Sequence, residues 1–151
     1  MSENISENLD LDLCGAITER FELAHKDVRQ IPALTLAYLG DAVYELVIRT
    51  MLVEQGTMHV SDLNKAAVGY VRAAAQKDLF KAVETMLDEE EMAAFKRGRN
   101  VKSNSCAKNA SVTDYRIATG FEALVGYLYL NNRLDRVLEL VHAGICVLQE
   151  Q

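Results

Sequence analysis

The sequence contains one proline, Pro32, among 151 residues, and no stretch in which apolar and polar side chains alternate between turn residues. Such alternation is typical of half-buried β-strands, whereas apolar residues that recur every three to four positions indicate helices. The helical spacing runs through most of the chain. We therefore predict an all-α fold, a helical bundle with a core that a chain of this length is able to bury.

Local signals predict where the helices begin and end. Pro32 suits the start of a helix, because its missing N–H costs nothing there, and Gly56 suits the end of that helix. Ser61 and Asp88 are candidate N-caps of two later helices. The predicted helices cover about 11–25, 33–54, 62–83, 89–99, 112–130 and 134–148, and a loop is predicted at 103–111.

The composition, with 50% hydrophobic and 25% charged residues, is that of a globular protein, and the features of the chain described next lead us to expect a cytoplasmic location. The acidic, polar N-terminus has no signal-peptide pattern. The longest apolar stretch, 117–130, is too short to span a membrane and contains Glu122. The three cysteines, Cys14, Cys106 and Cys146, show no metal-ligand spacing and are expected to be reduced thiols.

Two of the predicted helices are almost wholly apolar, and each carries one carboxylate near its middle: Asp41 in the first and Glu122 in the second. An ionised carboxylate in apolar surroundings is unfavourable unless a cation or hydrogen-bond donors compensate it. Glycine in a helix interior costs about 1 kcal/mol relative to alanine, so a glycine there indicates close packing. Three glycines lie beside the acids and would let the two backbones approach: Gly40, Gly120 and Gly126.

The acid pair has two interpretations. In the first, Asp41 and Glu122 meet and bind a divalent ion, and their oxygen ligands favour Mg²⁺ or Mn²⁺ over zinc. In the second, each acid pairs with an arginine or caps a neighbouring helix. Glu45 lies one turn after Asp41 on the same face. It either orients the metal site, or serves as an outer ligand, or forms an exposed salt bridge.

The net charge of −6 is unevenly distributed along the chain. The segment 96–116 has six basic residues and one acid, a local net charge of +5, whereas 1–22 is strongly acidic. A basic stripe is what phosphate binding requires, and the polar residues at 103–109 add neutral donors. No cluster of stacking aromatic residues is present, which speaks against binding of single strands. The segment is therefore either a duplex nucleic-acid contact or a solvated helix end.

Taken together, these motifs resemble the ribonuclease III family. The segment Leu39-Gly40-Asp41-Ala42-Val43 is similar to the family signature, and 121–130, which contains Glu122, is similar to its second acidic motif. Between them, 96–103, 108–109 and 115–116 resemble the Mini-ribonuclease III subgroup. The similarity covers about 33–140 and rests on the order and spacing of the motifs.

Two positions depart from full-length ribonuclease III. The family has an acid one turn before the signature aspartate, where this chain has Ala37. It has another acid three residues before the glutamate, where this chain has Thr119. Asp41 and Glu122 then remain as the two clear acids, as in the Mini-ribonuclease III pattern.

The resemblance implies a ribonuclease III-like helical catalytic domain at 31–151, after an N-terminal extension, 1–30, that is partly helical or disordered. It implies a homodimeric endoribonuclease that cleaves double-stranded RNA with Mg²⁺, or with Mn²⁺ as a substitute, and leaves 5′-phosphate ends. Asp41 and Glu122 would be the catalytic metal ligands, and Glu45 would orient them. Phosphates would be held by Arg97, Arg99, Asn100, Lys102 and Lys108.

The expected natural substrate is a precursor of ribosomal RNA of the 23S type, and no segment after the catalytic domain would form a double-stranded-RNA-binding domain. Two other functions stay open. The chain is a catalytically silent ribonuclease III-like protein that only binds RNA, which Ala37 and Thr119 motivate, or a helical protein-interaction module with both acids in internal salt bridges.

Overall fold

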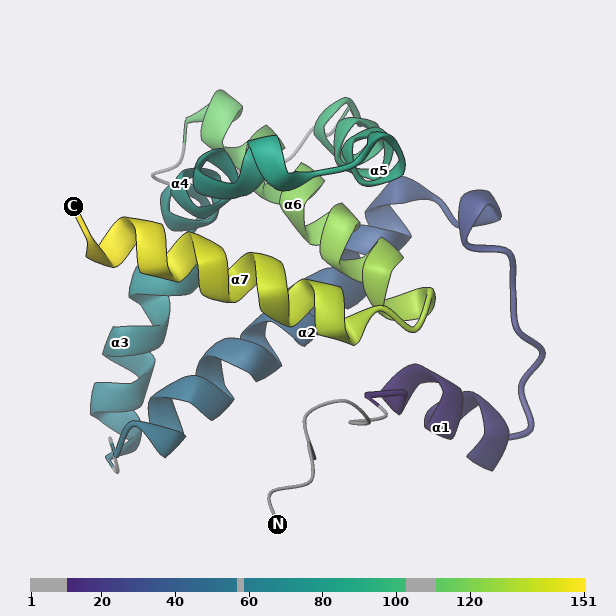
Figure 1. The fold of residues 1–151 in the computed structure, drawn as a ribbon, viewed down its shortest axis with the longest axis horizontal. Coiled ribbons are helices and arrows are strands. Elements are labelled where there is room, and N and C mark those ends of the chain that lie inside the picture. The colour runs from purple at the N-terminus through teal and green to yellow at the C-terminus, as the bar shows by residue number, and fades with distance from the viewer. Residues whose placement is uncertain (1–10, 57–58, 103–110) are drawn as a thin grey trace, which may run out of the picture.

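The computed structural model describes residues 11–56, 59–102 and 111–151, and Figure 1 shows them as a bundle of helices. The α-helices are α1 (Leu13–Arg20), α2 (Ala33–Glu54), α3 (Val60–Val71), α4 (Ala73–Val83), α5 (Glu89–Arg99), α6 (Val112–Leu130) and α7 (Leu134–Gln149). Two short 3-10 turns are η2 (Val28–Gln30) and η3 (Glu84–Met86). These ranges contain no β-strand, which confirms the all-α prediction, and no helix with the length and apolar character of a membrane span.

Helix α6 lies at the centre of the molecule, where it packs against α2, α4, α5 and α7 (Figure 1). Phe121 on α6 is fully buried and meets Tyr44 of α2 edge to face, with the ring centroids 5.4 Å apart. On another side of the core, Phe80 of α4 stacks on Phe95 of α5. Aromatic pairs of this kind contribute beyond the apolar area that they bury. The core therefore forms around α6 and holds that helix in a fixed position.

The predicted ends of three helices are confirmed. Pro32 immediately precedes α2, and Gly56, which follows that helix, has a φ of 103°, a left-handed conformation that glycine adopts readily. The Ser111 hydroxyl caps α6. At the start of α5, Asp88 and Glu91 form a reciprocal capping box, which satisfies two backbone N–H groups that the helix itself leaves free.

The single helix predicted at 62–83 is wrong, because the chain forms α3 and α4 there instead. The break falls at Arg72, whose ψ of 153° is extended. Helix α3 also begins earlier than predicted, at Val60, so Ser61 lies inside the helix and is not its N-cap. No proline marks this break in the sequence, and the nearest glycine, Gly69, lies inside α3.

Side chains from elsewhere account for the break between α3 and α4. The Tyr44 hydroxyl of α2 donates a hydrogen bond to the carbonyl oxygen of Tyr70, at 2.8 Å. The Gln76 amide of α4 donates to the carbonyl oxygen of Val71, at 2.9 Å. The last carbonyls of a helix have no partner within it, and these two donors satisfy them. The tertiary structure therefore stabilises an end of α3 that the local sequence does not specify.

The first helix is also shorter than the predicted range of about 11–25. It ends at Arg20, and the following Glu22 has a φ of 54°, a left-handed conformation that does not continue a helix. Cys14 of α1 is buried as part of the hydrophobic core. Cys14 and Cys146 are free thiols, as predicted, and Cys106 lies outside the described residues.

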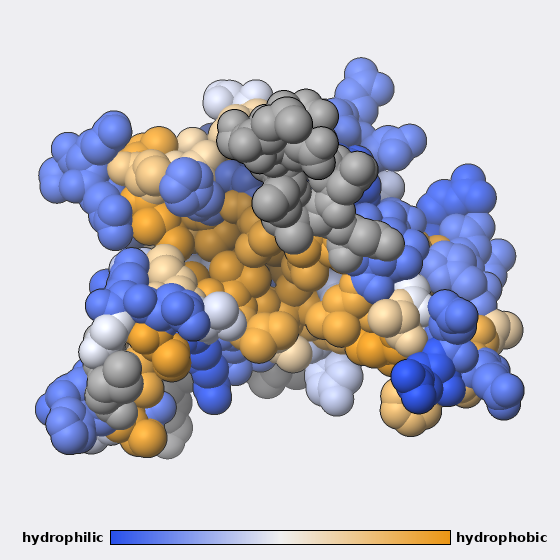
Figure 2. Space-filling view, turned by 60° about the horizontal axis from the view of Figure 1, so that its bottom comes forward, coloured by the Kyte–Doolittle hydropathy of each residue, from blue (hydrophilic) through white to orange (hydrophobic). Residues whose placement is uncertain are grey.

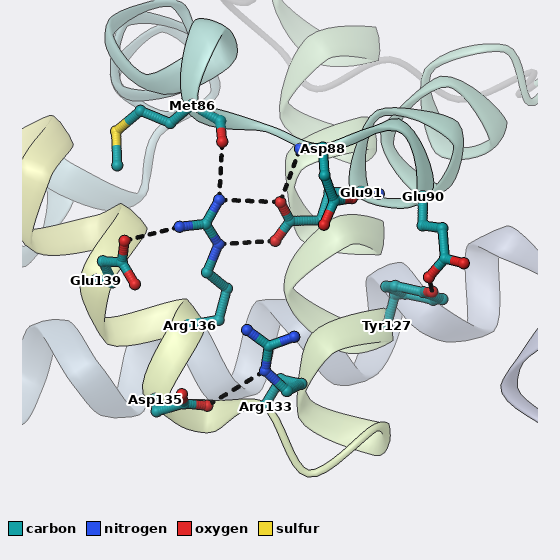
Figure 3. A network of polar contacts seen from close by, with 9 residues as sticks. All are labelled: Met86, Asp88, Glu90, Glu91, Tyr127, Arg133, Asp135, Arg136 and Glu139. Atoms are coloured by element: carbon teal, nitrogen blue, oxygen red, sulfur yellow. Dashed lines mark hydrogen bonds and ion pairs between the residues drawn. The ribbon is translucent and has the colours of Figure 1, made fainter. Parts of the chain in front are cut away.

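A buried ion pair joins α5 to α7 (Figure 3). The Arg136 guanidinium donates to both oxygens of the Glu91 carboxylate, at 2.8 and 3.0 Å. Its remaining donors reach the Met86 carbonyl oxygen and the Glu139 carboxylate, each at 2.8 Å. Burial alone would raise the pKa of the Glu91 carboxyl, but the hydrogen bonds from Arg136 and from the Asp88 backbone outweigh it and lower that pKa. The charge on Glu91 is therefore fully compensated.

Candidate active site

The helices that carry the two predicted acids touch through their backbones. A Cβ atom on Gly40 of α2 would overlap the carbonyl oxygen of Glu122 on α6, and it would lie 2.7 Å from the backbone nitrogen of Gly126. A Cβ atom on Gly126 would overlap the carbonyl oxygen of Leu36. Only glycine permits this approach, so the prediction that Gly40 and Gly126 bring the two backbones together is confirmed.

Gly120 has a different role from the one predicted, because it faces α5 and not α2. A Cβ atom there would lie 2.7 Å from a ring carbon of Phe95. On α5, a Cβ atom on Gly98 would lie 2.6 Å from the Cβ of Ala123. Glycines thus let α6 approach α2 along one side and α5 along another.

The structure brings Asp41, Glu122 and Glu45 into electrostatic contact. Burial is the main cause that raises the pKa of Glu122 to about 7, and repulsion from Asp41 is the next. Partial burial, followed by repulsion from Glu45, raises the pKa of Asp41. Burial raises a carboxyl pKa by removing water, whereas repulsion raises it only when a second carboxylate lies nearby. The acids therefore form one negatively charged cluster at the contact between α2 and α6.

The cluster is more open to solvent than the apolar sequence around it suggested. Asp41 is exposed, while Glu122 and Glu45 are partly buried. This follows from the position of α2, which packs on α6 with one side and leaves another side uncovered. A substrate phosphate is therefore able to approach the acids from solvent.

The cluster suits a hard divalent cation. Within the described ranges, neither Asp41 nor Glu122 takes part in a salt bridge, whereas Glu45 lies 3.5 Å from the guanidinium of Arg49. The interpretation in which each acid pairs with an arginine thus has no support in these residues. Those ranges contain no group of three or more histidine, cysteine or acidic side chains placed to hold a metal ion, so Glu45 is not placed as a third ligand. Two carboxylates with excess negative charge fit Mg²⁺, which usually takes one or two of them and keeps several waters.

The positions of the two additional family acids contribute no carboxylate. Ala37 is buried in a small apolar cluster that also contains Ala123. The Thr119 hydroxyl donates to the carbonyl oxygen of Tyr115 at 2.9 Å, within its own helix. The charge of the site therefore comes from Asp41 and Glu122, with Glu45 nearby.

Gln76 belongs to the site and was missed in the sequence. It lies on α4, which packs against α6, and its side chain is 1% exposed. Its amide donates a hydrogen bond to the Val71 carbonyl oxygen and lies close enough to Glu122 to lower the pKa of that carboxyl. The available signal was its spacing, because it occupies the helix face of Leu79, Phe80 and Val83, where a polar side chain is unexpected.

Two of the predicted RNA-binding arginines already make contacts within the protein. The Arg97 guanidinium donates to the carbonyl oxygen of Ile31 at 2.9 Å, which ties α5 to the segment before α2. Arg99 donates to the Asn100 side chain at 3.1 Å and lies over the Phe95 ring, 5.7 Å from its centroid. Both side chains are thereby oriented by their neighbours.

The basic end of α5 lies beside the part of α6 that carries Glu122. Gly98 packs directly against Thr119, Gly120 and Ala123. Asn100 and Lys102 follow this contact and are exposed. Lys108 lies outside the described residues. The end of α5, which leads to Asn100 and Lys102, therefore lies beside the same turn of α6 that carries Glu122.

Comparisons with known proteins agree with these motifs. Residues 34–133 match the ribonuclease III domain family. A Mini-ribonuclease 3 of Clostridium tetani is 45% identical over 130 residues, which cover 85% of this chain and 86% of that protein. A Mini-ribonuclease 3 of a Thermoanaerobacter species is 44% identical over 142 residues, which cover 94% of this chain and all of that protein, 100%.

A solved structure shows the same fold. The crystal structure of a protein from Fusobacterium nucleatum matches with a TM-score of 0.72 and 32% sequence identity. The match covers 83% of this chain and 99% of that one.

Proposed function

Since the chain belongs to the ribonuclease III family and is an endoribonuclease of its Mini-ribonuclease III group, we propose that Asp41 and Glu122 hold the magnesium ion with which it hydrolyses double-stranded RNA. Manganese would substitute for magnesium at such a site. The observation that carries the proposal is the backbone contact at Gly40, which brings the two carboxylates together beside solvent.

The chain's own residues have separate roles in this proposal. Asp41, which is exposed, and Glu122, which is partly buried, each offer an oxygen ligand. Glu45 orients the pair and is itself held by Arg49. When bound, the ion supplies Lewis-acid stabilisation of the scissile phosphodiester and acidifies the attacking water. The products of this hydrolysis would carry 5′-phosphate and 3′-hydroxyl ends.

The basic segment is proposed to hold the RNA backbone, with recognition of duplex shape in place of base stacking. The end of α5 lies next to the α6 residues that flank Glu122, which supports this assignment. Its proposed phosphate contacts are Arg97, Arg99, Asn100, Lys102 and Lys108. We further propose, from the resemblance to Mini-ribonuclease III, that residues 31–151 form the catalytic domain and act in the cytoplasm on precursors of 23S-type ribosomal RNA.

A homodimer is also proposed, and the exposed apolar side of α2 supports it. Leu34, Tyr38, Leu46 and Val53 follow one another at helical spacing and are 46–82% exposed. Beside them, a groove of about 350 Å³ runs between α1, α2 and α7 and is lined mainly by apolar side chains. Figure 2 shows the apolar area on this side of the molecule. A twofold dimer would bury this area and suit an RNA duplex, which has local twofold axes.

The proposed function is tested by Asp41→Asn and Glu122→Gln in a cleavage assay with duplex RNA and Mg²⁺. Cleavage should fall at least about a hundredfold, because even the outer partners of metal ligands contribute about 10–100-fold. Thermal unfolding should show that both variants stay folded. Glu54→Gln is the matched control, since it removes an exposed acid at the far end of α2 and should leave cleavage unchanged.

Two outcomes would contradict the proposal. Cleavage by Asp41→Asn at the wild-type rate would remove Asp41 from the reaction. If the wild-type protein binds duplex RNA but does not cut it with Mg²⁺ or Mn²⁺, the chain is instead the silent RNA-binding member of the family.

A further inference from the structure

Gln76 and Glu91 are the two polar side chains that the described part of the protein buries, at 1% and 3% exposure. Glu91 has partners for both of its carboxylate oxygens, which Arg136 supplies. The Gln76 side chain is different, because its Oε1 atom has no hydrogen-bond partner among the described residues. A buried acceptor without a partner is unfavourable, whereas an apolar side chain of similar size would avoid that cost. Packing alone therefore does not explain why a glutamine occupies this position.

The amide nitrogen of Gln76 links two parts of the molecule. One of its N–H groups points to the carbonyl oxygen of Val71, at 2.9 Å, at the end of α3. The amide also lies close enough to Glu122 on α6 to lower the pKa of that carboxyl. Because the Val71 carbonyl belongs to the backbone, it fixes the plane of the amide. The Val71 bond therefore holds the amide in place near the Glu122 carboxyl without any ligand.

We propose that Gln76 is a positioning residue, which holds the Glu122 carboxylate in the orientation that cation binding requires. This inference rests on the proposed metal role of Glu122. Metal ligands in proteins are commonly oriented by hydrogen bonds from neighbouring side chains, and loss of such a bond weakens metal binding. Gln76 would supply such a bond from a buried position, where its own hydrogen bond to Val71 holds the amide beside α6.

A purely structural role for Gln76 is the competing explanation, since its bond to Val71 also stabilises the end of α3. The protein offers a matched control for that role. Tyr44 donates to the carbonyl oxygen of the preceding residue, Tyr70, at 2.8 Å. Tyr44→Phe therefore removes a buried hydrogen bond to the same helix end without changing the amide beside Glu122.

The experiment measures binding of Mn²⁺ alone to the full chain by isothermal titration calorimetry, together with the Mg²⁺ dependence of kcat on a short RNA duplex. For Gln76→Leu, the Kd for Mn²⁺ should rise about 10–100-fold, and kcat at limiting Mg²⁺ should fall with it. The KM for RNA should stay within about twofold, because the RNA contacts are elsewhere. Tyr44→Phe should lower the melting temperature and leave the Kd for Mn²⁺ unchanged.

Asp41→Asn and Glu122→Gln separate a failure of this inference from a failure of the proposed function. If these two variants lose Mn²⁺ binding and Gln76→Leu keeps it, the positioning role is wrong and the metal site stands. If they retain Mn²⁺ binding, both proposals are overturned. Should Gln76→Leu fail to fold, Gln76→Met takes its place. If neither variant folds, the Gln76 amide is needed for folding itself, and the positioning role is overturned.

Discussion

At Gly40 and Gly126, peptide groups of α2 and α6 meet with no side chain between them. A glycine within a helix costs about 1 kcal/mol relative to alanine, so each of them lowers the intrinsic stability of its own helix. The close approach that they permit offsets this cost through packing. Gly69 of α3 is different, because a Cβ atom there would meet no atom within 4 Å.

The first prediction therefore compares alanine at these positions. Gly40→Ala should destabilise the protein by about 1–3 kcal/mol or more, because overlap with the Glu122 carbonyl outweighs the gain in helix propensity. Gly69→Ala should instead stabilise it by about 0.4–1 kcal/mol. Urea unfolding measures both changes. Equal stability of the two variants would show that α2 and α6 do not approach as closely as described.

At the scale of residues, the sequence predicted the acids of the site but not the amide beside them. Asp41 and Glu122 stood out because each lies near the middle of a largely apolar helical stretch. Gln76 became meaningful only through its partners Val71 and Glu122, which lie on other helices. Spacing along one helix shows that a polar side chain is misplaced, but it does not show what that side chain touches.

At the scale of elements, helix ends were predictable where the chain itself supplies the cap. Helix α2 begins after Pro32, and α6 begins after Ser111, both as expected. The break between α3 and α4 was not predictable, because one of the donors that stabilise it, Tyr44, is 26 residues from its acceptor Tyr70. A contact between residues so far apart leaves no trace in local sequence patterns.

The ion pair between α5 and α7 gives a prediction at this scale. Arg136→Met should lower the free energy of unfolding by about 3–5 kcal/mol at neutral pH, because it leaves the Glu91 charge buried without a partner. Since Arg136 lowers the pKa of Glu91, the stabilisation should be present above the ordinary glutamate pKa of 4.5 and should be lost as the pH falls below it. Unfolding of both proteins in urea between pH 7 and pH 3 measures this difference.

The control for this prediction is Lys81→Met, which removes an exposed ion pair with Glu84. Exposed pairs contribute about 0–1 kcal/mol, so this variant should stay close to the wild type. A loss in Arg136→Met no larger than that in Lys81→Met would mean that the Glu91 carboxylate is solvated or neutral.

At the scale of the whole molecule, two different sides of α2 are apolar, and the sequence does not show which of them is buried. One side of the helix, with Tyr44 and Ile48, enters the core. Another side, with Tyr38 and Leu46, is exposed in the single chain. Both sides follow the same helical spacing, so periodicity alone predicts a helix covered on several sides. The structure is needed to separate the core from a surface that suits a second copy.

This surface gives the prediction for the whole molecule. Leu46→Asp should convert the proposed dimer into a monomer, because a charge would be buried at the centre of the apolar side of α2. Sedimentation velocity at micromolar concentration measures the change. Mn²⁺ binding should persist, since each chain holds its own pair of acids. Val68→Asp, at an exposed apolar position on α3, should remain dimeric. A dimeric Leu46→Asp protein would place the interface elsewhere.

The contact of main chain against main chain at Gly40 has a consequence for how such a protein changes over evolution. The gap between the two acid-bearing helices is fixed by peptide dimensions, which do not vary from one sequence to another. Drift in the interior would then alter heat tolerance well before it altered the spacing of the two acid-bearing helices. A laboratory selection for a wider spacing of these helices would have to act on positions 40 and 126 themselves.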